Sequence, residues 1–183
     1  MSDLLMGVAA GVVASALYWT IVIVLSRPRF RFSPAALSEL EDAPGSLRVK
    51  VLNRMPWSVR GVTFHAALVR EGGAYSRIHE PLVVRSFTQP VMGGWWNAIG
   101  RRRRYGWMGA SHRVIEISRV APSPRSLADE VKAGAELAVW IECTDGLLLA
   151  FRGWVLHVYG ASDVQSGIFA RGRSLRSHQV MEI

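Results

Sequence analysis

A run of about 22 residues without a charge, Leu4 to Leu25, constrains this chain more than any other feature. At a helical rise of about 1.5 Å per residue, the run would reach about 33 Å, which is enough to cross the hydrocarbon core of a bilayer. Eleven of its residues are Leu, Ile or Val, and together they favour membrane insertion by roughly 3 to 7 kcal/mol. The run therefore predicts an N-terminal transmembrane α-helix that anchors the rest of the chain.

Two other interpretations of the run fit less well. A buried helix of a soluble protein usually keeps one polar face, and this run has none. A cleaved signal peptide begins with a basic segment and has a shorter apolar core, whereas Asp3 is the only charged residue before this run. We therefore expect residues 1–26 to form an uncleaved anchor.

The charges beside the run predict its orientation. Arg27, Arg29 and Arg31 follow it directly, and no Lys or Arg precedes it. The positive-inside rule then places the N-terminus outside and the C-terminal bulk in the cytoplasm, so the expected location is the plasma (inner) membrane, crossed once. The lone cysteine, Cys143, agrees with a reducing compartment, but it is weak support because it has no partner for an internal disulfide.

Small residues recur every four positions on one face of the predicted helix: Gly7, Gly11 and Ser15. Such a pattern lets two membrane helices approach closely, so it predicts a helix-mediated homodimer. Small residues are also common in membrane helices that do not associate, and the sequence leaves this alternative open.

The chain of 183 residues carries a formal net charge of +8, but the charge is concentrated in two places. The arginines at 27, 29 and 31 contribute +3, and residues 95–125 hold seven arginines against one glutamate. The remaining bases and acids after the anchor balance. This distribution describes a neutral body with two basic spots and makes nucleic acid an unlikely partner.

After the anchor, apolar and polar residues alternate in short segments, as in half-buried β-strands. The segments are 27–32, 47–51, 59–70, 78–84, 114–117, 137–144 and 147–159. Turn residues separate them, and no long amphipathic helix interrupts them. The pattern predicts an all-β antiparallel sandwich, divided into an anchor (1–26), a juxtamembrane strand and connector (27–46) and a sandwich domain (47–183). Within the connector, Ser33 is expected to cap a short helical turn.

The strongest local signal is Asp145-Gly146 between two apolar runs, which favours a two-residue hairpin turn. A turn of that length would place Trp140 opposite Phe151. It would also put Arg152 on the face of Val139, which is wrong for a core unless a bulge interrupts the second strand.

Three segments resemble those of uncharacterised bacterial single-pass membrane proteins that have a cytoplasmic immunoglobulin-like sandwich after one N-terminal span. They are the exit Ser26-Arg27-Pro28-Arg29-Phe30, the stretch Arg48 to Arg54, and the ending Gly167 to Ser174. The resemblance covers roughly a fifth of the chain. It implies the fold and the topology, and it implies no activity, cofactor or partner.

No catalytic or metal-binding pattern is present in the sequence. The five histidines, including His65 and His157 within predicted strands, form no H-x-H or H-E-x-x-H motif, and the glycines form no nucleotide-binding motif. Cys143 is expected to be a small buried hydrophobe, and Asp129, Glu130 and Asp145 are expected in turns or loops. We therefore expect no enzyme activity, no metal and no cofactor.

The most unusual stretch is residues 93–109, which combine aromatic rings with consecutive arginines between glycines. Its candidate contact residues are Trp95, Trp96, Arg101, Arg102, Arg103, Arg104, Tyr105 and Trp107. Arginines pair with phosphates, and Trp and Tyr favour the headgroup zone, so one interpretation is contact with anionic lipid, together with Arg27, Arg29 and Arg31. Contact with nucleic acid is the weaker functional alternative. A solvated hairpin tip without a partner is the third.

Two functions from different classes remain. The first is a membrane-anchored interaction or scaffold module that holds a protein partner. The second is a membrane-tethered sensor or regulatory domain for a small ligand. A polar pocket lined by His65, His157 or Arg152 would favour the sensor, and a flat exposed aromatic patch would favour the interaction module.

Overall fold

A computed structural model describes residues 2–26, 29–38, 45–71, 77–85, 91–94, 111–121, 123–144, 152–171 and 173–178. The elements are α1 (Ser2–Ser26), β1 (Phe30–Phe32), β2 (Ala36–Ser38), β3 (Leu47–Asn53), β4 (Val59–Glu71), β5 (Arg77–Arg85), β6 (Val91–Met92), β7 (His112–Ser118), α3 (Leu127–Lys132), β8 (Glu136–Thr144), β9 (Arg152–Tyr159), η1 (Ala161–Asp163), β10 (Val164–Ser166), β11 (Ile168–Phe169) and β12 (Ser177–His178). Strands dominate after α1, which confirms the predicted all-β class.

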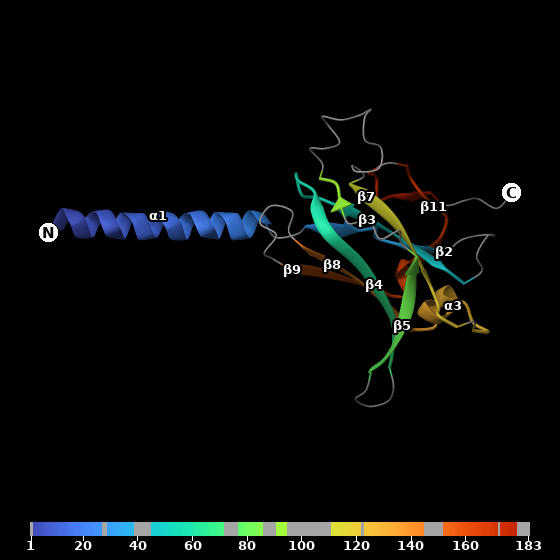
Figure 1. Ribbon diagram of the computed structural model, residues 1–183. Helices are drawn as coiled ribbons and strands as arrows, with labels where there is room; N and C mark the ends of the chain where they lie inside the picture. The colour runs from blue at the N-terminus through green and yellow to red at the C-terminus, as the bar shows by residue number, and fades with distance from the viewer. Residues whose placement is uncertain are drawn as a thin grey trace.

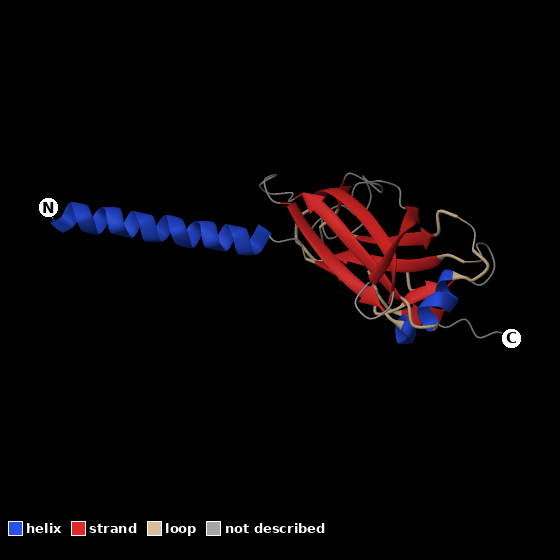
Figure 2. Cartoon of the chain, turned by 90° about the horizontal axis from the view of Figure 1, so that it is seen from below, coloured by secondary structure: helices blue, strands red, loops and turns tan. Residues whose placement is uncertain are grey.

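The helix α1 projects away from the strands as a separate rod (Figures 1 and 2). Its described side chains, Met6 to Val22, are exposed along nearly the whole length. Large apolar side chains in it, such as Met6 and Val12, keep 75% and 63% of their surface exposed. Over the part of the chain that the structure describes, no helix meets both the length and the apolar character needed to cross a membrane.

Ten strands form one large mixed sheet that curls almost into a barrel (Figure 2). The main path runs β10-β2-β3-β7-β5-β4-β8-β9, with β1 paired to β3 and β6 paired to β4. β5 pairs with β4 along one half and with β7 along the other, so it joins the two halves of the sheet. β10 and β2 are parallel, whereas the prediction was an antiparallel arrangement throughout.

Side chains bring the two ends of the sheet together. The Tyr159 hydroxyl of β9 donates a hydrogen bond of 3.0 Å to the Ser33 carbonyl oxygen, between β1 and β2. The ring of His157 stacks on Phe32 with centroids 5.3 Å apart. Burial raises the pKa of the Tyr159 hydroxyl and lowers that of the His157 imidazole. Both groups are therefore neutral near pH 7, as suits the edge of an apolar core.

The core lies between the two curved halves of the sheet. Alternate residues of β3, β7 and β8 fill it, and their side chains are fully buried: Leu47, Val49, Val51, Ile115, Ile117, Leu137, Val139 and Ile141. Each buried side chain of this kind contributes about 1.5 to 3 kcal/mol relative to an exposed one. The apolar residues of the alternating sequence pattern are therefore the ones that face the core in these strands. Cys143 is buried as well, as predicted.

The predicted register of the β8–β9 hairpin is wrong. Trp140 pairs with Leu156 rather than with Phe151, and Val139 pairs with His157 rather than with Arg152. The shift reverses which residues of β9 face the core. The observed register places Tyr159 opposite Leu137 and Val155 opposite Ile141, so these apolar side chains face the core. The turn itself lies outside the described residues.

Two smaller predictions are also corrected. Ser33 caps no helical turn; its hydroxyl donates to the Ala35 carbonyl oxygen, and β2 follows directly. Asp129 and Glu130 lie in α3 rather than in a loop, with Ser126 as the N-cap that accepts from the Asp129 amide. β1 and β2 both pair with β3, so residues 30–38 form part of the sheet.

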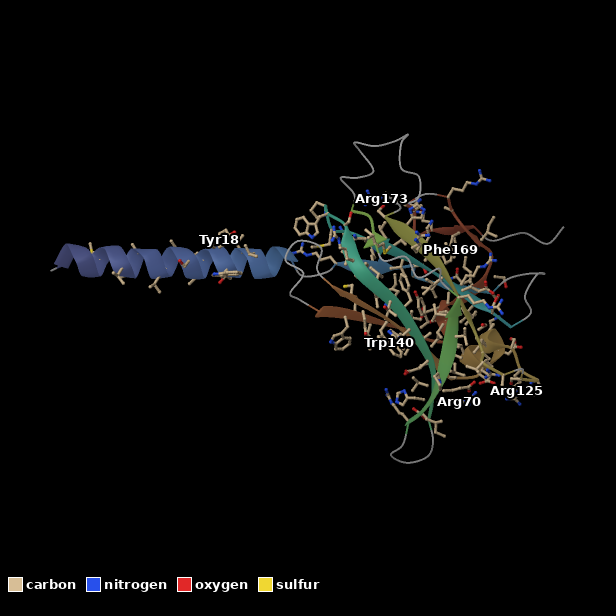
Figure 3. All side chains as sticks on the ribbon, viewed as in Figure 1. Tyr18, Arg70, Arg125, Trp140, Phe169 and Arg173 are labelled. Carbon is tan, nitrogen blue, oxygen red and sulfur yellow. The ribbon has the colours of Figure 1, made fainter. Side chains whose placement is uncertain are left out.

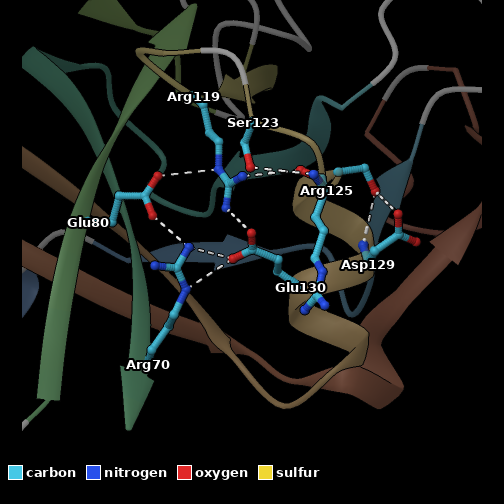
Figure 4. A network of polar contacts seen from close by, with 8 residues as sticks. Arg70, Glu80, Arg119, Ser123, Arg125, Asp129 and Glu130 are labelled. Atoms are coloured by element: carbon cyan, nitrogen blue, oxygen red, sulfur yellow. Dashed lines mark hydrogen bonds and ion pairs between the residues drawn. The ribbon is translucent and has the colours of Figure 1, made fainter. Parts of the chain in front are cut away.

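An ionic network holds α3 against β4 and β5 (Figure 4). Glu130 of α3 is contacted by both Arg70 and Arg119, and Glu80 of β5 contacts the same two arginines. The side chains of Arg119 and Glu130 are only 10% and 13% exposed. Two cations thus balance two carboxylates at this end of the domain.

Candidate binding surface on the outer face of the sheet

The side of β4, β8 and β9 that points away from the core forms an exposed apolar surface, which we call the outer face. Pairing places its members opposite one another: His65 with Trp140, Ala67 with Ala138, Trp140 with Leu156, and Glu142 with Trp154. Trp154, Leu156 and Val158 of β9 are 70%, 48% and 42% exposed. Three large apolar side chains in a row on one strand are unusual for a face in contact with water.

A shallow groove of about 860 Å³ runs across the outer face. Small residues form its floor, namely Gly61, Ala67, Pro81 and Ala138, and indole rings form its walls, namely Trp140 and Trp154. Figure 3 shows Trp140 on this side of the domain. Small residues beneath large rings make a groove because the rings stand above the plane of the sheet.

A break in β4 shapes one end of the groove. The pairing of β4 with β8 shifts between Arg60 and Thr63, and Gly61 lies there with a φ of 56°. Glycine adopts this conformation without the strain that a side chain would add. This irregularity is a β-bulge, and it changes the pairing register between the start of β4 and the rest of the strand.

The polar groups of the outer face lie beside the rings. The imidazole of His65 stacks on Trp140 with centroids 5.2 Å apart. Its Nε2 atom lies 3.8 Å from the Glu142 carboxylate. Thr63 and His79 also line the groove. The surface thus combines a wide apolar area with a few hydrogen-bonding groups, the composition typical of protein-binding sites.

His65 and His157 do not share a pocket. His65 lies on the outer face, whereas His157 packs against Phe32 and Tyr159 on the inner side of β9. Arg152 lies at the start of β9, and its side chain is outside the described residues. Among the described residues, the structure therefore places His65 beside Trp140 and His157 on the opposite side of β9, so these two histidines do not line one pocket.

The predicted lipid-contact residues are only partly within the described chain. Arg29 and Arg31 are exposed at the start of the sheet. Arg27 and residues 95–110, which include every aromatic and arginine candidate of the insert, lie outside the described residues.

The entry to the insert is held by a buried asparagine. The Asn53 side chain donates to the carbonyl oxygens of Trp57, Met92 and Gly93 and accepts from the Met55 amide. A Cβ atom on Gly94 would lie 2.3 Å from the Pro56 carbonyl oxygen, so only glycine fits there. These contacts fix where the insert leaves the sheet.

Gly7, Gly11 and Ser15 are exposed on α1, and a Cβ atom on either glycine would meet nothing within 4 Å. Their role in self-association stays a prediction. Among the described residues, no group of three or more His, Cys, Asp or Glu side chains could hold a metal ion. Comparison with protein-family models and with curated proteins found no match to this chain.

Sequence reasoning missed the outer face as a site. The signal was present, because β9 is apolar on both faces: Val155 and Tyr159 point inward, while Trp154, Leu156 and Val158 point outward. A strand at the end of a sheet needs only one apolar face to fold. The second apolar face is the signal that could have identified this surface from the sequence.

Proposed function

We propose that this protein is a membrane-tethered, non-catalytic interaction module whose outer face binds a protein partner at the bilayer. The exposed apolar row of Trp154, Leu156 and Val158 carries the proposal. Exposed Trp side chains are enriched at the centres of protein interfaces, because they bury a large area at a low entropic cost.

The anchor in this proposal is α1. Its described apolar side chains are largely exposed, so we expect another apolar phase to cover them. The uncharged run in the sequence, Leu4 to Leu25, extends beyond these side chains at both ends. A bilayer is the phase that a helix with no polar face would enter. The arginines at 27, 29 and 31 support a cytoplasmic location for the sheet domain.

The fold fits a module of this kind. We propose that the sheet is an immunoglobulin-like sandwich whose two halves are joined along β5. Sandwiches of this class commonly bind partners through an exposed sheet face or an end loop. The insert at 93–109 would add contact with anionic lipid through its arginines and aromatic rings.

A small apolar ligand is the second candidate for the groove, whose volume of about 860 Å³ lies within the range of ligand pockets. Such pockets enclose most of their ligand, however, and this groove lies open on a sheet face beside a Trp that is 70% exposed. The geometry therefore favours a broad protein surface over an enclosed ligand.

A photo-crosslinking amino acid at position 156 should form a discrete adduct with a protein partner in native membranes. The expectation follows from the central place of Leu156 on the outer face, between Trp154 and Val158. The measurement is a gel shift of the full-length chain after irradiation, with adduct masses determined by mass spectrometry.

The matched control carries the same crosslinker at Val120, an apolar residue that is 74% exposed between β7 and α3. Adduct formation at 156, with loss of the adduct in Trp154→Glu, would support the proposal. Equal adducts from both positions, or none from 156, would refute a specific partner on the outer face.

A further inference from the structure

A lysine is buried on the side of β3 that points away from the core. Val49 and Val51 face the core, so Lys50 between them points to the other side, yet it is only 2% exposed. The C-terminal segment that carries β11 covers it. The Lys50 ammonium donates a hydrogen bond of 2.5 Å to the Ala170 carbonyl oxygen and lies 6.0 Å from the centre of the Phe169 ring.

A histidine with an unused ring nitrogen lies beside this ammonium. His112 of β7 pairs with Leu52, and Lys50 pairs with Val114, so His112 and Lys50 are diagonal neighbours on one face. The Nδ1 atom of His112 is buried and has no hydrogen-bond partner among the described residues. A buried polar atom without a partner destabilises the fold, so a ligand that accepts a hydrogen bond from it would be bound favourably.

Positive charge gathers at this place. Burial lowers the pKa of His112, and the cations Lys50, Arg113 and Arg173 lower it further. Burial also lowers the pKa of Lys50. Figure 3 shows Phe169 and Arg173 in the same part of the domain, well separated from Trp140 on the outer face.

No carboxylate compensates these charges within the described chain. The ion pairs formed there involve other residues, and Lys50, Arg113 and Arg173 take part in none of them. Arg70 and Arg119 differ in this respect, because those two arginines share two carboxylates. A buried ammonium beside further cations is costly, and a bound anion would offset that cost.

We propose that Lys50, His112 and Arg173, here called the Lys50 cluster, bind a phosphate group. The Lys50 ammonium has two protons beyond the one given to Ala170, and neutral His112 can donate from Nδ1. Arg173 is exposed and can close over the anion with its forked guanidinium. The phosphate could belong to a lipid headgroup or to a soluble molecule. Phosphate binding at the Lys50 cluster requires no contact with the outer face.

The test follows the imidazole signal of His112 by NMR, using the full-length chain in nanodiscs with isotope-labelled histidine. Inorganic phosphate is titrated into discs of neutral phosphatidylcholine, and chloride at the same ionic strength serves as the reference. A second sample uses discs that contain phosphatidic acid. A saturating shift with inorganic phosphate identifies a soluble ligand, whereas a shift confined to phosphatidic acid discs identifies a headgroup. Either shift supports the cluster.

Lys50→Met should weaken the binding about tenfold or more, because it removes a charged hydrogen bond from a buried site. Lys132→Met is the matched control, since Lys132 is the only other lysine and is exposed on α3. If Lys50→Met does not fold, Arg173→Met replaces it, with an expected weakening of about threefold or more for an exposed charge. The proposal is overturned if His112 shifts in neither disc, or if Lys132→Met weakens binding as much as the cluster variants.

Discussion

Replacing both Val12 and Val13 with arginine is expected to release the full-length chain from membranes. The two residues lie near the middle of α1 and are 63% and 58% exposed. Each arginine at a helix centre opposes insertion by about 2.5 to 3.5 kcal/mol, so the pair would cancel the roughly 3 to 7 kcal/mol supplied by the apolar residues of the run. The measurement is the fraction of protein that stays in the membrane pellet after alkaline extraction.

Val12→Leu combined with Val13→Leu is the control, because it keeps the positions apolar. The unaltered chain and this control should remain in the pellet. Retention of the double arginine variant, or release of the unaltered chain, would contradict the proposed anchor.

Glu130→Gln is expected to cost about 3 kcal/mol of unfolding free energy. The substitution removes the carboxylate that Arg70 and Arg119 share and leaves Arg119, whose side chain is 10% exposed, short of a counter-charge. Breaking a buried ion pair usually costs about 3 to 5 kcal/mol, and the partial exposure of Arg70 and Glu80 places this value at the lower end. Guanidinium unfolding of the full-length chain in a nonionic detergent, followed by circular dichroism, measures it.

The exposed pair Arg77–Glu136, 4.0 Å apart, provides the control. Glu136→Gln should cost less than about 1 kcal/mol. Equal losses for the two variants would show that the network around Glu130 does not hold α3.

The same carboxylate should make stability depend on pH. Burial alone would raise the pKa of Glu130, but the ion pair with Arg119 and the hydrogen bonds from Arg70 outweigh it and lower the pKa below its usual 4.5. A carboxyl whose pKa is lower in the folded state stabilises the fold above the unfolded pKa, and this stabilisation is lost as the pH falls through the folded pKa. The unaltered domain should therefore weaken below about pH 4.5, and the Glu130→Gln variant should show a shallower loss there.

The strands could be predicted from the sequence because burial of one face imposes a period of two. Val49 and Val51 flank Lys50, Ile115 and Ile117 flank Glu116, and all four apolar residues are buried. The same rule fails where both faces are apolar. In β9 the period of two does not show whether the side with Trp154 or the side with Tyr159 is buried. The pairing of β9 with β8 was therefore predicted from the turn signal at Asp145-Gly146, and that prediction was wrong.

The location of Lys50 could not be predicted for a different reason. In the sequence it is the polar member of an alternating strand, which indicates a solvent-facing side chain. It is covered instead by Phe169 and Ala170, about 120 residues further along the chain. Contacts between residues so far apart in the chain leave no periodic pattern in the sequence. The ion pair between Arg70 and Glu130 could not be predicted for the same reason.

The most direct test of the proposed function measures how accessible position 158 on the outer face is to a labelling reagent. A Val158→Cys variant is labelled with a membrane-impermeant maleimide in inverted native vesicles and again after purification in detergent; the native Cys143 is buried and gives a low background. Val120→Cys, on an exposed residue outside the outer face, is the reference. If a partner covers the outer face, position 158 is labelled slowly in vesicles and fast after purification, whereas position 120 is labelled fast in both. Equally fast labelling of position 158 in vesicles and in detergent would show that nothing covers the outer face.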